Sequence, residues 1–458
     1  MTDKKFLNSD EVSEIIAKLG YEFAVVHNPA PLYPEIELYP LAPKITVPQK
    51  DLSAVILDLE GTVCSTLDLR LHSLEYVVRS ISGRLTKDEW KGLDPLIDRP
   101  NLMGISTSEQ IRYLVQRYHN FIKPEAMKES YLHSVLWTLI SGHNEERKDE
   151  ASFSLDQFGL GEMLKDSKLH EFMLQKEFSK FNSNLITNYF LHKYGSQLSI
   201  KNFDDTVRAA AEIFFQHYHQ MLELIKYGEG SNLAEEISGQ SELPLVRPMP
   251  SIPLLFALAK GLLGEDVAYL FDEMSQELKH KSSQVYRISS QEEAREKLVK
   301  LGKYFESHPL KLALVTSSGG YEADIILVEL FNVISHEIRK WKIPQAKKET
   351  LLEKFSDYKN IVNVFITGDK VSKIRPKPHR DLFSIALSRL GLPQSMFSQI
   401  VGFEDSENGI IALRASGIGL TAAVPVMRNS RHDLSAASFI LQGGITEALL
   451  NYNLFMSL

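Results

Sequence analysis

The feature that most constrains this chain is the segment at residues 54–63, AVILDLEGTV, in which four apolar residues lead into an aspartate and a glycine turn. Residues 54–57 lack the polar alternation of a half-exposed strand, so we expect a strand covered on both faces, as in a parallel sheet. Asp58 then stands at the carboxyl end of that strand. Because open α/β sheets bind ligands beyond this end, Asp58 is a candidate site residue.

Alternating strand and helix patterns in the second half of the chain support a parallel sheet. Such alternation is typical of a doubly wound, Rossmann-like α/β fold, which is our predicted fold class. The predicted strands are 312–315, 362–367, 399–403, 418–424 and 438–441, and the predicted helices are 291–304, 380–390 and 406–416.

Residues 67–246 follow a different pattern, in which apolar residues recur at the three- and four-residue spacing of helices. Within 205–226, one stripe consists of Val207, Ala211, Phe214, Tyr218, Leu222 and Ile225. A stripe of this kind is the buried face of a helix. We therefore predict a large all-helical domain inserted after the first strand of the sheet.

This reading divides the chain into an α/β core, the helical insert and an N-terminal extension. The core comprises residues 51–66 and 247–458, with 265–290 as a possible further insertion. Residues 1–50 begin with a helix pattern and are rich in proline, which lacks the amide hydrogen and restricts its predecessor. We expect the extension to run extended over a surface, and we assign it no chemistry.

Composition excludes several classes of function. The 458 residues carry a formal net charge of −8, so no broad cationic field exists for nucleic acid or anionic lipid. Cys64 is the only cysteine, which excludes an intramolecular disulfide. No uncharged apolar run reaches the roughly 18 residues of a membrane span, and the first residues lack a signal-peptide pattern. We expect a cytoplasmic protein without nucleic-acid or membrane partners.

Three further segments place polar groups close to predicted strands or between prolines. Thr316, after the strand at 312–315, offers a hydroxyl and, with Ser317 and Ser318, backbone amides near a helix start, where a phosphoryl oxygen can be received. Lys377 lies between two prolines, which stiffen the backbone around an ammonium that can neutralise a transferring group. Glu404 and Asp405 follow the strand at 399–403.

The acidic residues predict a metal site. Asp58, Glu404 and Asp405 would repel one another, and a phosphate, unless a divalent cation lay among them. Magnesium suits such a site because it takes few protein carboxylates and keeps waters and phosphate oxygens as its other ligands. A carboxylate such as that of Asp58 can also attack phosphorus and carry the group as an acyl phosphate.

Together the four segments resemble the four motifs of the haloacid dehalogenase superfamily, in the branch that contains β-phosphoglucomutase and sugar phosphatases. The resemblance covers residues 51 to about 120 and 246 to 450, and it implies an enlarged helical cap. It also implies that Asp58 is the nucleophile and a magnesium ligand with Asp405. The Glu60 backbone carbonyl would be a further ligand, and Glu404 would support the metal indirectly, by contact with the groups that bind it.

Glu60 departs from the pattern of the superfamily, most members of which have a second aspartate there as general acid and base. Glutamate keeps the carboxylate but adds a methylene, so proton transfer requires a compensating shift of the turn. Two outcomes stay open: a working acid/base, or a slow, substrate-restricted or inactive site.

The predicted function is a magnesium-dependent phosphohydrolase that acts on a small phosphate monoester, such as a sugar phosphate, through an aspartyl-phosphate intermediate. Asp58, Glu60 and Lys377 are the predicted catalytic residues. One alternative is a phosphomutase like β-phosphoglucomutase, in which the acyl phosphate survives water. Another is a catalytically impaired binding or scaffold protein with the same fold. The oligomeric state does not follow from the sequence.

Overall fold

The structure, a computed structural model, describes residues 6–28, 33–48, 51–86, 88–179, 181–281, 290–369, 375–426, 432–452 and 454–456. The chain forms two compact units. One consists of Met1–Ser65 and Val246–Leu458, and the other of Thr66–Leu245.

The first unit contains a six-stranded sheet in the order β10-β9-β8-β3-β6-β7, and every neighbouring pair is parallel. The predicted parallel α/β sheet is therefore confirmed. The two central strands, β3 and β8, are each buried along all five residues, as the unbroken apolar sequence of β3 requires. The strands are β3 (Ala54–Asp58), β6 (Lys311–Val315), β7 (Val364–Ile366), β8 (Ile400–Glu404), β9 (Leu420–Ala423) and β10 (Phe439–Ile440).

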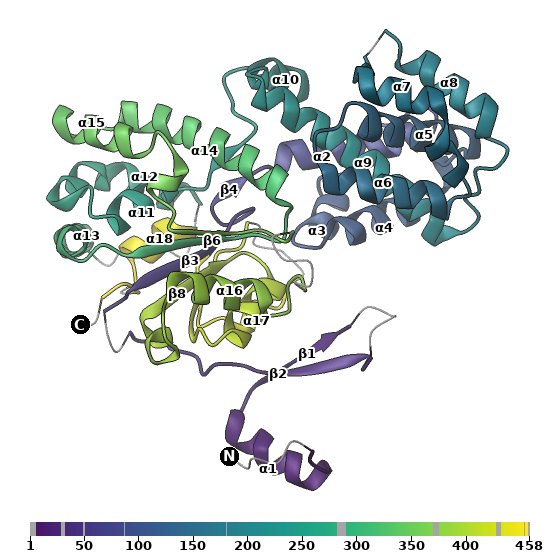
Figure 1. The fold of residues 1–458 in the computed structure, drawn as a ribbon. Helices are drawn as coiled ribbons and strands as arrows, with labels where there is room; N and C mark the ends of the chain where they lie inside the picture. Colours follow the sequence, from purple (N-terminus) through teal and green to yellow (C-terminus); the bar gives the residue numbers. More distant parts are fainter. Residues whose placement is uncertain are drawn as a thin grey trace. The chain divides into compact units, whose positions relative to one another are not determined.

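Helices cover both faces of this sheet (Figure 1). On one face Phe383 of α16 and Ile410 of α17 pack in a single core with Ile56 of β3. On the other face the rings of Phe256 and Phe331, from α11 and α14, lie 6.1 Å apart. The helices of this unit that follow the first strand are α11 (Ile252–Ala259), α12 (Phe271–Lys281), α13 (Gln291–Ser307), α14 (Gly320–Lys340), α15 (Gln345–Lys354), α16 (Asp381–Leu390), α17 (Glu407–Ala415) and α18 (Gly444–Leu450).

Short 3₁₀ turns connect some of these helices and strands. They are η3 (Gly264–Leu270), η4 (Tyr358–Asn360), η5 (Gln394–Gln399) and η6 (Leu434–Ala436). The possible insertion at 265–290 contains most of η3 and all of α12, and its residues 282–289 lie outside the described part of the chain.

The N-terminal extension differs from the extended path that its prolines suggested. After α1 (Ser9–Leu19), strands β1 (Phe23–His27) and β2 (Ile36–Pro40) pair as an antiparallel hairpin. Ala24 and Val26 point into a small core while Val25 is exposed, which is the alternation of a half-buried sheet. The alternation of apolar and polar positions in residues 23–27 therefore predicts the local structure better than the proline content does.

Every regular element among the described residues of the second unit is a helix, which confirms the predicted helical insert after β3. In α9 (Phe203–Lys226) five of the six stripe residues are buried, and Ala211 is half-buried. The other elements are α2 (Leu67–Ile81), α3 (Asp98–Leu102), α4 (Thr107–Arg117), η1 (His119–Phe121), α5 (Pro124–Ile140), α6 (Glu145–Gln157), η2 (Gly161–Lys165), α7 (Ser167–Gln175), α8 (Ser183–Tyr194) and α10 (Gly230–Ser238). Across the described ranges of both units, every helix is too short or too polar to cross a lipid bilayer.

Candidate active site

Three of the predicted site positions meet at the carboxyl edge of the sheet because their strands are neighbours. Asp58 is the last residue of β3 and Glu404 is the last residue of β8. Val315 of β6 lies opposite Asp58, so Thr316 follows at the same edge. The sheet register therefore brings Asp58 together with two segments that lie more than 250 positions further along the sequence.

Lys377 reaches into this edge from the segment before α16. Its ammonium donates to Asp58 Oδ1 and, at 2.6 Å, to Glu404 Oε1. Its side chain is only 9% exposed, so the ion pairs form away from bulk water. The ammonium also lies 5.1 Å from the centre of the Phe383 ring. One cation thus links the predicted nucleophile to the acidic segment at the end of β8.

Asp58, Glu404 and Asp405 form a compact cluster in which one oxygen from each residue lies within 4.8 Å of the others. Glu404 is fixed in this cluster because its Oε2 accepts hydrogen bonds of 2.9 Å from both the amide and the hydroxyl of Ser406. Gly61 has φ +92, and a Cβ there would lie 2.3 Å from Asp405 Oδ2. Only glycine allows the turn after β3 to come this close to the cluster.

Burial and mutual repulsion perturb the ionisation of the cluster. Burial raises the pKa of Asp58 well above its ordinary value, and the negative charges of Glu404 and Asp405 add to this against the opposing effect of Lys377. Burial and Glu404 likewise raise the pKa of Asp405. Burial alone would lower the pKa of Lys377, but the carboxylates of Asp58 and Glu404 raise it above its ordinary value. The cluster has more negative charge than Lys377 compensates.

This donor set fits a magnesium ion. Its oxygens are hard ligands, the three carboxylates converge, and their repulsion is what a divalent cation would relieve. Zinc would call for histidine or thiolate ligands, and the cluster is made of carboxylates alone.

Glu60 has an unexpected partner set. Its Oε2 accepts a hydrogen bond of 2.7 Å from the Thr316 hydroxyl, and its Oε1 accepts one of 2.7 Å from the Ser318 hydroxyl. The Ser318 amide in turn donates to Thr316 Oγ1 at 3.0 Å. The Thr316 hydroxyl, which we predicted to receive a phosphoryl oxygen, is therefore already hydrogen-bonded to the Glu60 carboxylate.

The turn at residues 59–64 places Glu60 in this position. The amides of Val63 and Cys64 both donate to the Leu59 carbonyl at 2.9 Å, and the Gly61 amide donates to the Cys64 carbonyl at 2.8 Å.

Cys64 is buried, and burial raises the pKa of its thiol well above the ordinary value. Cys64 is thus a packed residue beside the site.

The structure separates two neighbours that the sequence analysis treated alike. Ser317 is exposed, whereas the Ser318 hydroxyl binds Glu60. Sequence reasoning assigned Ser318 only a backbone role. The signal that could have identified its side chain is the extra methylene of Glu60, which extends the carboxylate toward the turn after β6.

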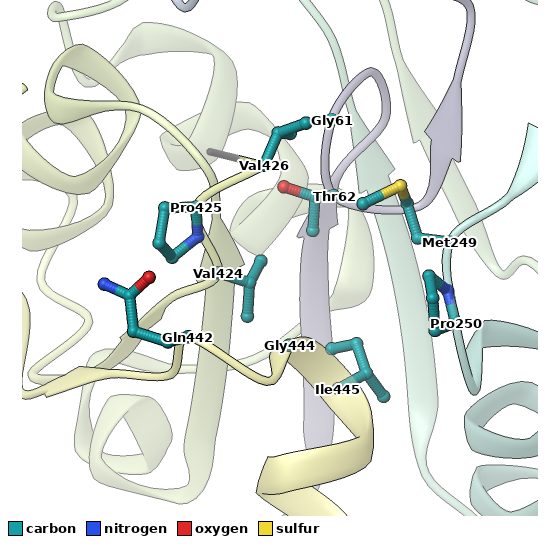
Figure 2. A pocket seen from close by; sticks show the side chains of 10 residues that line it. All are labelled: Gly61, Thr62, Met249, Pro250, Val424, Pro425, Val426, Gln442, Gly444 and Ile445. Atoms are coloured by element: carbon teal, nitrogen blue, oxygen red, sulfur yellow. The ribbon is translucent and has the colours of Figure 1, made fainter. Parts of the chain in front are cut away.

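A small cavity of about 150 Å³ lies beside the turn after β3 (Figure 2). Its lining includes Thr62, Met249, Val424, Gln442 and Ile445. The Thr62 hydroxyl and the Gln442 Oε1 are buried and have no hydrogen-bond partner in the described structure. A polar cavity of this size can hold a few waters that would satisfy both atoms. None of the predicted catalytic side chains lines it.

No protein-family model and no curated protein matches the chain. Similar solved structures include CbbY from Rhodobacter sphaeroides in complex with phosphate, at 14% identity and a TM-score of 0.38 over 88% of this chain and 100% of that one. A β-phosphoglucomutase from Clostridium difficile is 12% identical, with a TM-score of 0.32 over 85% and 91%. A subfamily IA hydrolase from Geobacter sulfurreducens is 12% identical, with a TM-score of 0.31 over 88% and 98%.

At such values these likenesses say nothing about substrate or activity. The strand order, the helical insertion after β3 and the meeting of these segments at one edge of the sheet agree with the fold that the sequence resemblance implied. The predicted fold class, a doubly wound parallel α/β sheet with an inserted helical unit, is therefore confirmed.

Proposed function

We propose that the chain is a magnesium-dependent phosphohydrolase that acts on a small phosphate monoester. The observation that carries the proposal is the contact of Lys377 with both Asp58 and Glu404 at the carboxyl edge of the sheet. A buried cation beside a carboxylate at this edge suits the transfer of an anionic group, because it offsets charge on the phosphoryl oxygens.

In the first step an Asp58 oxygen attacks phosphorus, and the bond from phosphorus to the ester oxygen breaks. The leaving oxygen takes a proton from the Glu60 carboxyl, and Asp58 then carries the phosphoryl group. In the second step Glu60 accepts a proton from water while the water oxygen attacks phosphorus. The bond to Asp58 breaks, and inorganic phosphate leaves.

Asp58, Glu404, Asp405 and the Glu60 backbone carbonyl are the groups that would hold or support Mg²⁺. When bound, this ion supplies positive charge that lowers the repulsion between nucleophile and phosphate. Lys377 neutralises a phosphoryl oxygen from the protein side. Thr316, with the backbone amides of Ser317 and Ser318, receives another oxygen.

Thr316 can do this only after the Glu60 carboxylate leaves it. A phosphoryl oxygen and the Glu60 carboxylate compete for the same hydroxyls, and both are negative. Substrate binding therefore requires rotation of the Glu60 side chain. The same rotation takes its carboxylate away from Thr316 and toward solvent, from which it takes up the proton that it then gives to the leaving oxygen.

This competition also favours a second candidate, a catalytically impaired protein that uses the fold for binding. If Glu60 never leaves Thr316 and Ser318, the phosphate position stays closed and no acid/base is present. A phosphomutase remains a variant of the first proposal, in which the acyl phosphate passes to a second hydroxyl of the substrate.

The test is release of phosphate from a panel of phosphorylated metabolites, with and without magnesium, by wild type and by Asp58→Asn. We expect magnesium-dependent release by wild type and none above background by the variant. Equal release by both proteins would remove Asp58 as the nucleophile.

A binding measurement separates the enzyme from the impaired protein. Beryllium fluoride with magnesium mimics an aspartyl phosphate, so it should raise the melting temperature of wild type and leave that of Asp58→Asn unchanged. Absence of a shift in wild type would favour the impaired protein. Conversion of glucose 1-phosphate to glucose 6-phosphate with a bisphosphate primer would identify a mutase.

A further inference from the structure

The N-terminal hairpin contacts the segment that contains Lys377. The Tyr39 hydroxyl lies 2.6 Å from Nδ1 of His379, and Nη1 of Arg375 donates to both carboxylate oxygens of Glu37 at 2.9 Å. These contacts flank Lys377 by two residues on each side. They join two parts of the first unit that are more than 330 positions apart.

Hydrogen bonds also join the two ends of the segment 375–381 to each other. Both the backbone amide and Nε of Arg375 donate to Asp381 Oδ2 at 3.2 Å, which joins the start of the segment to the first residue of α16. Arg375 thus links Asp381 to Glu37. Lys377 lies within the loop that this bond closes.

Glu37 and Tyr39 support one another. The Tyr39 hydroxyl donates to Glu37 Oε2 at 2.6 Å, and Asn28 donates to Glu37 Oε1 at 3.0 Å. The hydrogen bond from Tyr39, followed by that from Asn28, lowers the pKa of Glu37 to about 2. Glu37 is therefore an anion at neutral pH and can pair with the Arg375 guanidinium.

The hairpin has its own anchor on the element that follows the acidic segment. Arg414 of α17 is almost fully buried, and its guanidinium donates to the Ala42 carbonyl and to Glu22 Oε2 at 2.5 Å. The Ala42 amide donates back to the Arg414 carbonyl at 3.0 Å. The position of the hairpin is thus set by α17, which begins two residues after Asp405.

We propose that Glu37 and Tyr39 are positioning residues for Lys377: the hairpin holds the segment 375–381 so that the Lys377 ammonium stays between Asp58 and Glu404. This inference rests on the proposed function. A lysine has four rotatable side-chain bonds, so its backbone must be fixed if the ammonium is to meet a transferring group reproducibly. A misplacement of about 1 Å at such a site can cost on the order of a hundredfold in rate.

The experiment uses the full chain and two mild variants, Glu37→Gln and Tyr39→Phe. Glu37→Gln removes the charge that pairs with Arg375, and Tyr39→Phe keeps the ring but removes the hydroxyl. Glu35→Gln is the matched control, because it removes an exposed carboxylate from the same hairpin. Circular dichroism and thermal melting establish that each variant is folded.

Hydrogen exchange of the amides in 375–381 is the first readout and needs no enzymatic activity. We expect faster exchange in Glu37→Gln and Tyr39→Phe than in wild type and Glu35→Gln. The second readout is turnover of the best substrate, for which we expect kcat to fall about tenfold and KM to change less than twofold. In a Lys377→Met background the same two changes should have no further effect on kcat.

Unchanged exchange in both variants would refute the inference, as would faster exchange with unchanged kcat in an active enzyme. An equal fall in kcat in the Lys377→Met background would also overturn it, because the hairpin would then act through another group. If wild type shows no Asp58-dependent turnover but exchange responds as expected, the proposed function fails while the positioning of segment 375–381 is supported.

Discussion

The Thr316 hydroxyl donates a hydrogen bond of 2.7 Å to the Glu60 carboxylate, and this contact changes how the site must work. The sequence suggested separate tasks, with Thr316 receiving phosphate and Glu60 transferring a proton. In the structure the two side chains are hydrogen-bonded to each other, so neither is available for its predicted task. Whether the chain is an enzyme depends on how easily they separate.

Shortening Glu60 tests this directly. In Glu60→Asp the carboxylate loses one methylene and should no longer reach both hydroxyls, so the phosphate position opens. We expect inorganic phosphate to inhibit this variant about tenfold more strongly, which corresponds to roughly 1.4 kcal/mol of binding free energy. The measurement is the inhibition constant of phosphate in the turnover assay.

Glu60→Gln is the matched control, because it keeps the length and removes the charge. It should lose about 100-fold in kcat, since an amide cannot act as general acid or base. A Glu60→Asp variant with unchanged phosphate inhibition would contradict competition between Glu60 and phosphate.

Lys377 should contribute to stability as well as to chemistry. Lys377→Met leaves Asp58, Glu404 and Asp405 buried without their cation, and we expect a loss of about 3–5 kcal/mol in the free energy of unfolding without magnesium. Urea unfolding measures it. Lys342→Met, at an exposed lysine, should cost far less. Equal losses in the two variants would mean that Lys377 does not offset repulsion among the carboxylates of Asp58, Glu404 and Asp405.

Much of the site was predictable because it depends on strand ends. Asp58 and Glu404 were placed correctly since each ends an apolar run, and parallel neighbours in a sheet bring such ends together. Lys377 could be located from its two flanking prolines and its resemblance to a motif. Its simultaneous contact with Asp58 and Glu404 was not predicted.

The partners of Glu60 and Arg375 were not predictable, for two physical reasons. One methylene decides whether the Glu60 carboxylate reaches Thr316, and no sequence pattern records side-chain reach. The bond from Arg375 to Glu37 joins residues 338 positions apart without any periodicity between them. The hairpin that contains Glu37 was not predicted, because the proline content of residues 1–50 suggested an extended path. The alternation of buried and exposed positions in 23–27 indicates the strand instead.

Magnesium should stabilise the protein through the acidic cluster. Binding to the folded state alone adds about 2.7 kcal/mol at a magnesium concentration 100 times the dissociation constant. We expect the melting temperature of wild type to rise with magnesium and that of Asp405→Asn to respond much less. Asp272→Asn, at an exposed aspartate, is the control and should respond like wild type. An undiminished response in Asp405→Asn would place the ion elsewhere.

A pH-dependent term in stability should come from Glu337 of α14, well away from the cluster. Burial, followed by repulsion from Glu273 and Glu277, raises the pKa of Glu337 from 4.5 to about 7. Between these two values the unfolded chain ionises Glu337 while the folded chain keeps its proton. The folded state therefore loses stability as pH rises from about 4.5 to 7, and the loss is constant above that range.

Glu337→Gln removes this term. At pH 8 the variant should be more stable than wild type by on the order of 2 kcal/mol, and at pH 4 the two should be nearly equal, because Glu337 is then protonated in both states. Urea unfolding across this range measures the difference. Glu296→Gln, at an exposed glutamate of α13, should keep a constant offset from wild type. A constant offset for Glu337→Gln as well would show that the carboxyl of Glu337 ionises freely in the folded protein, and that the repulsion from α12 is relieved in solution.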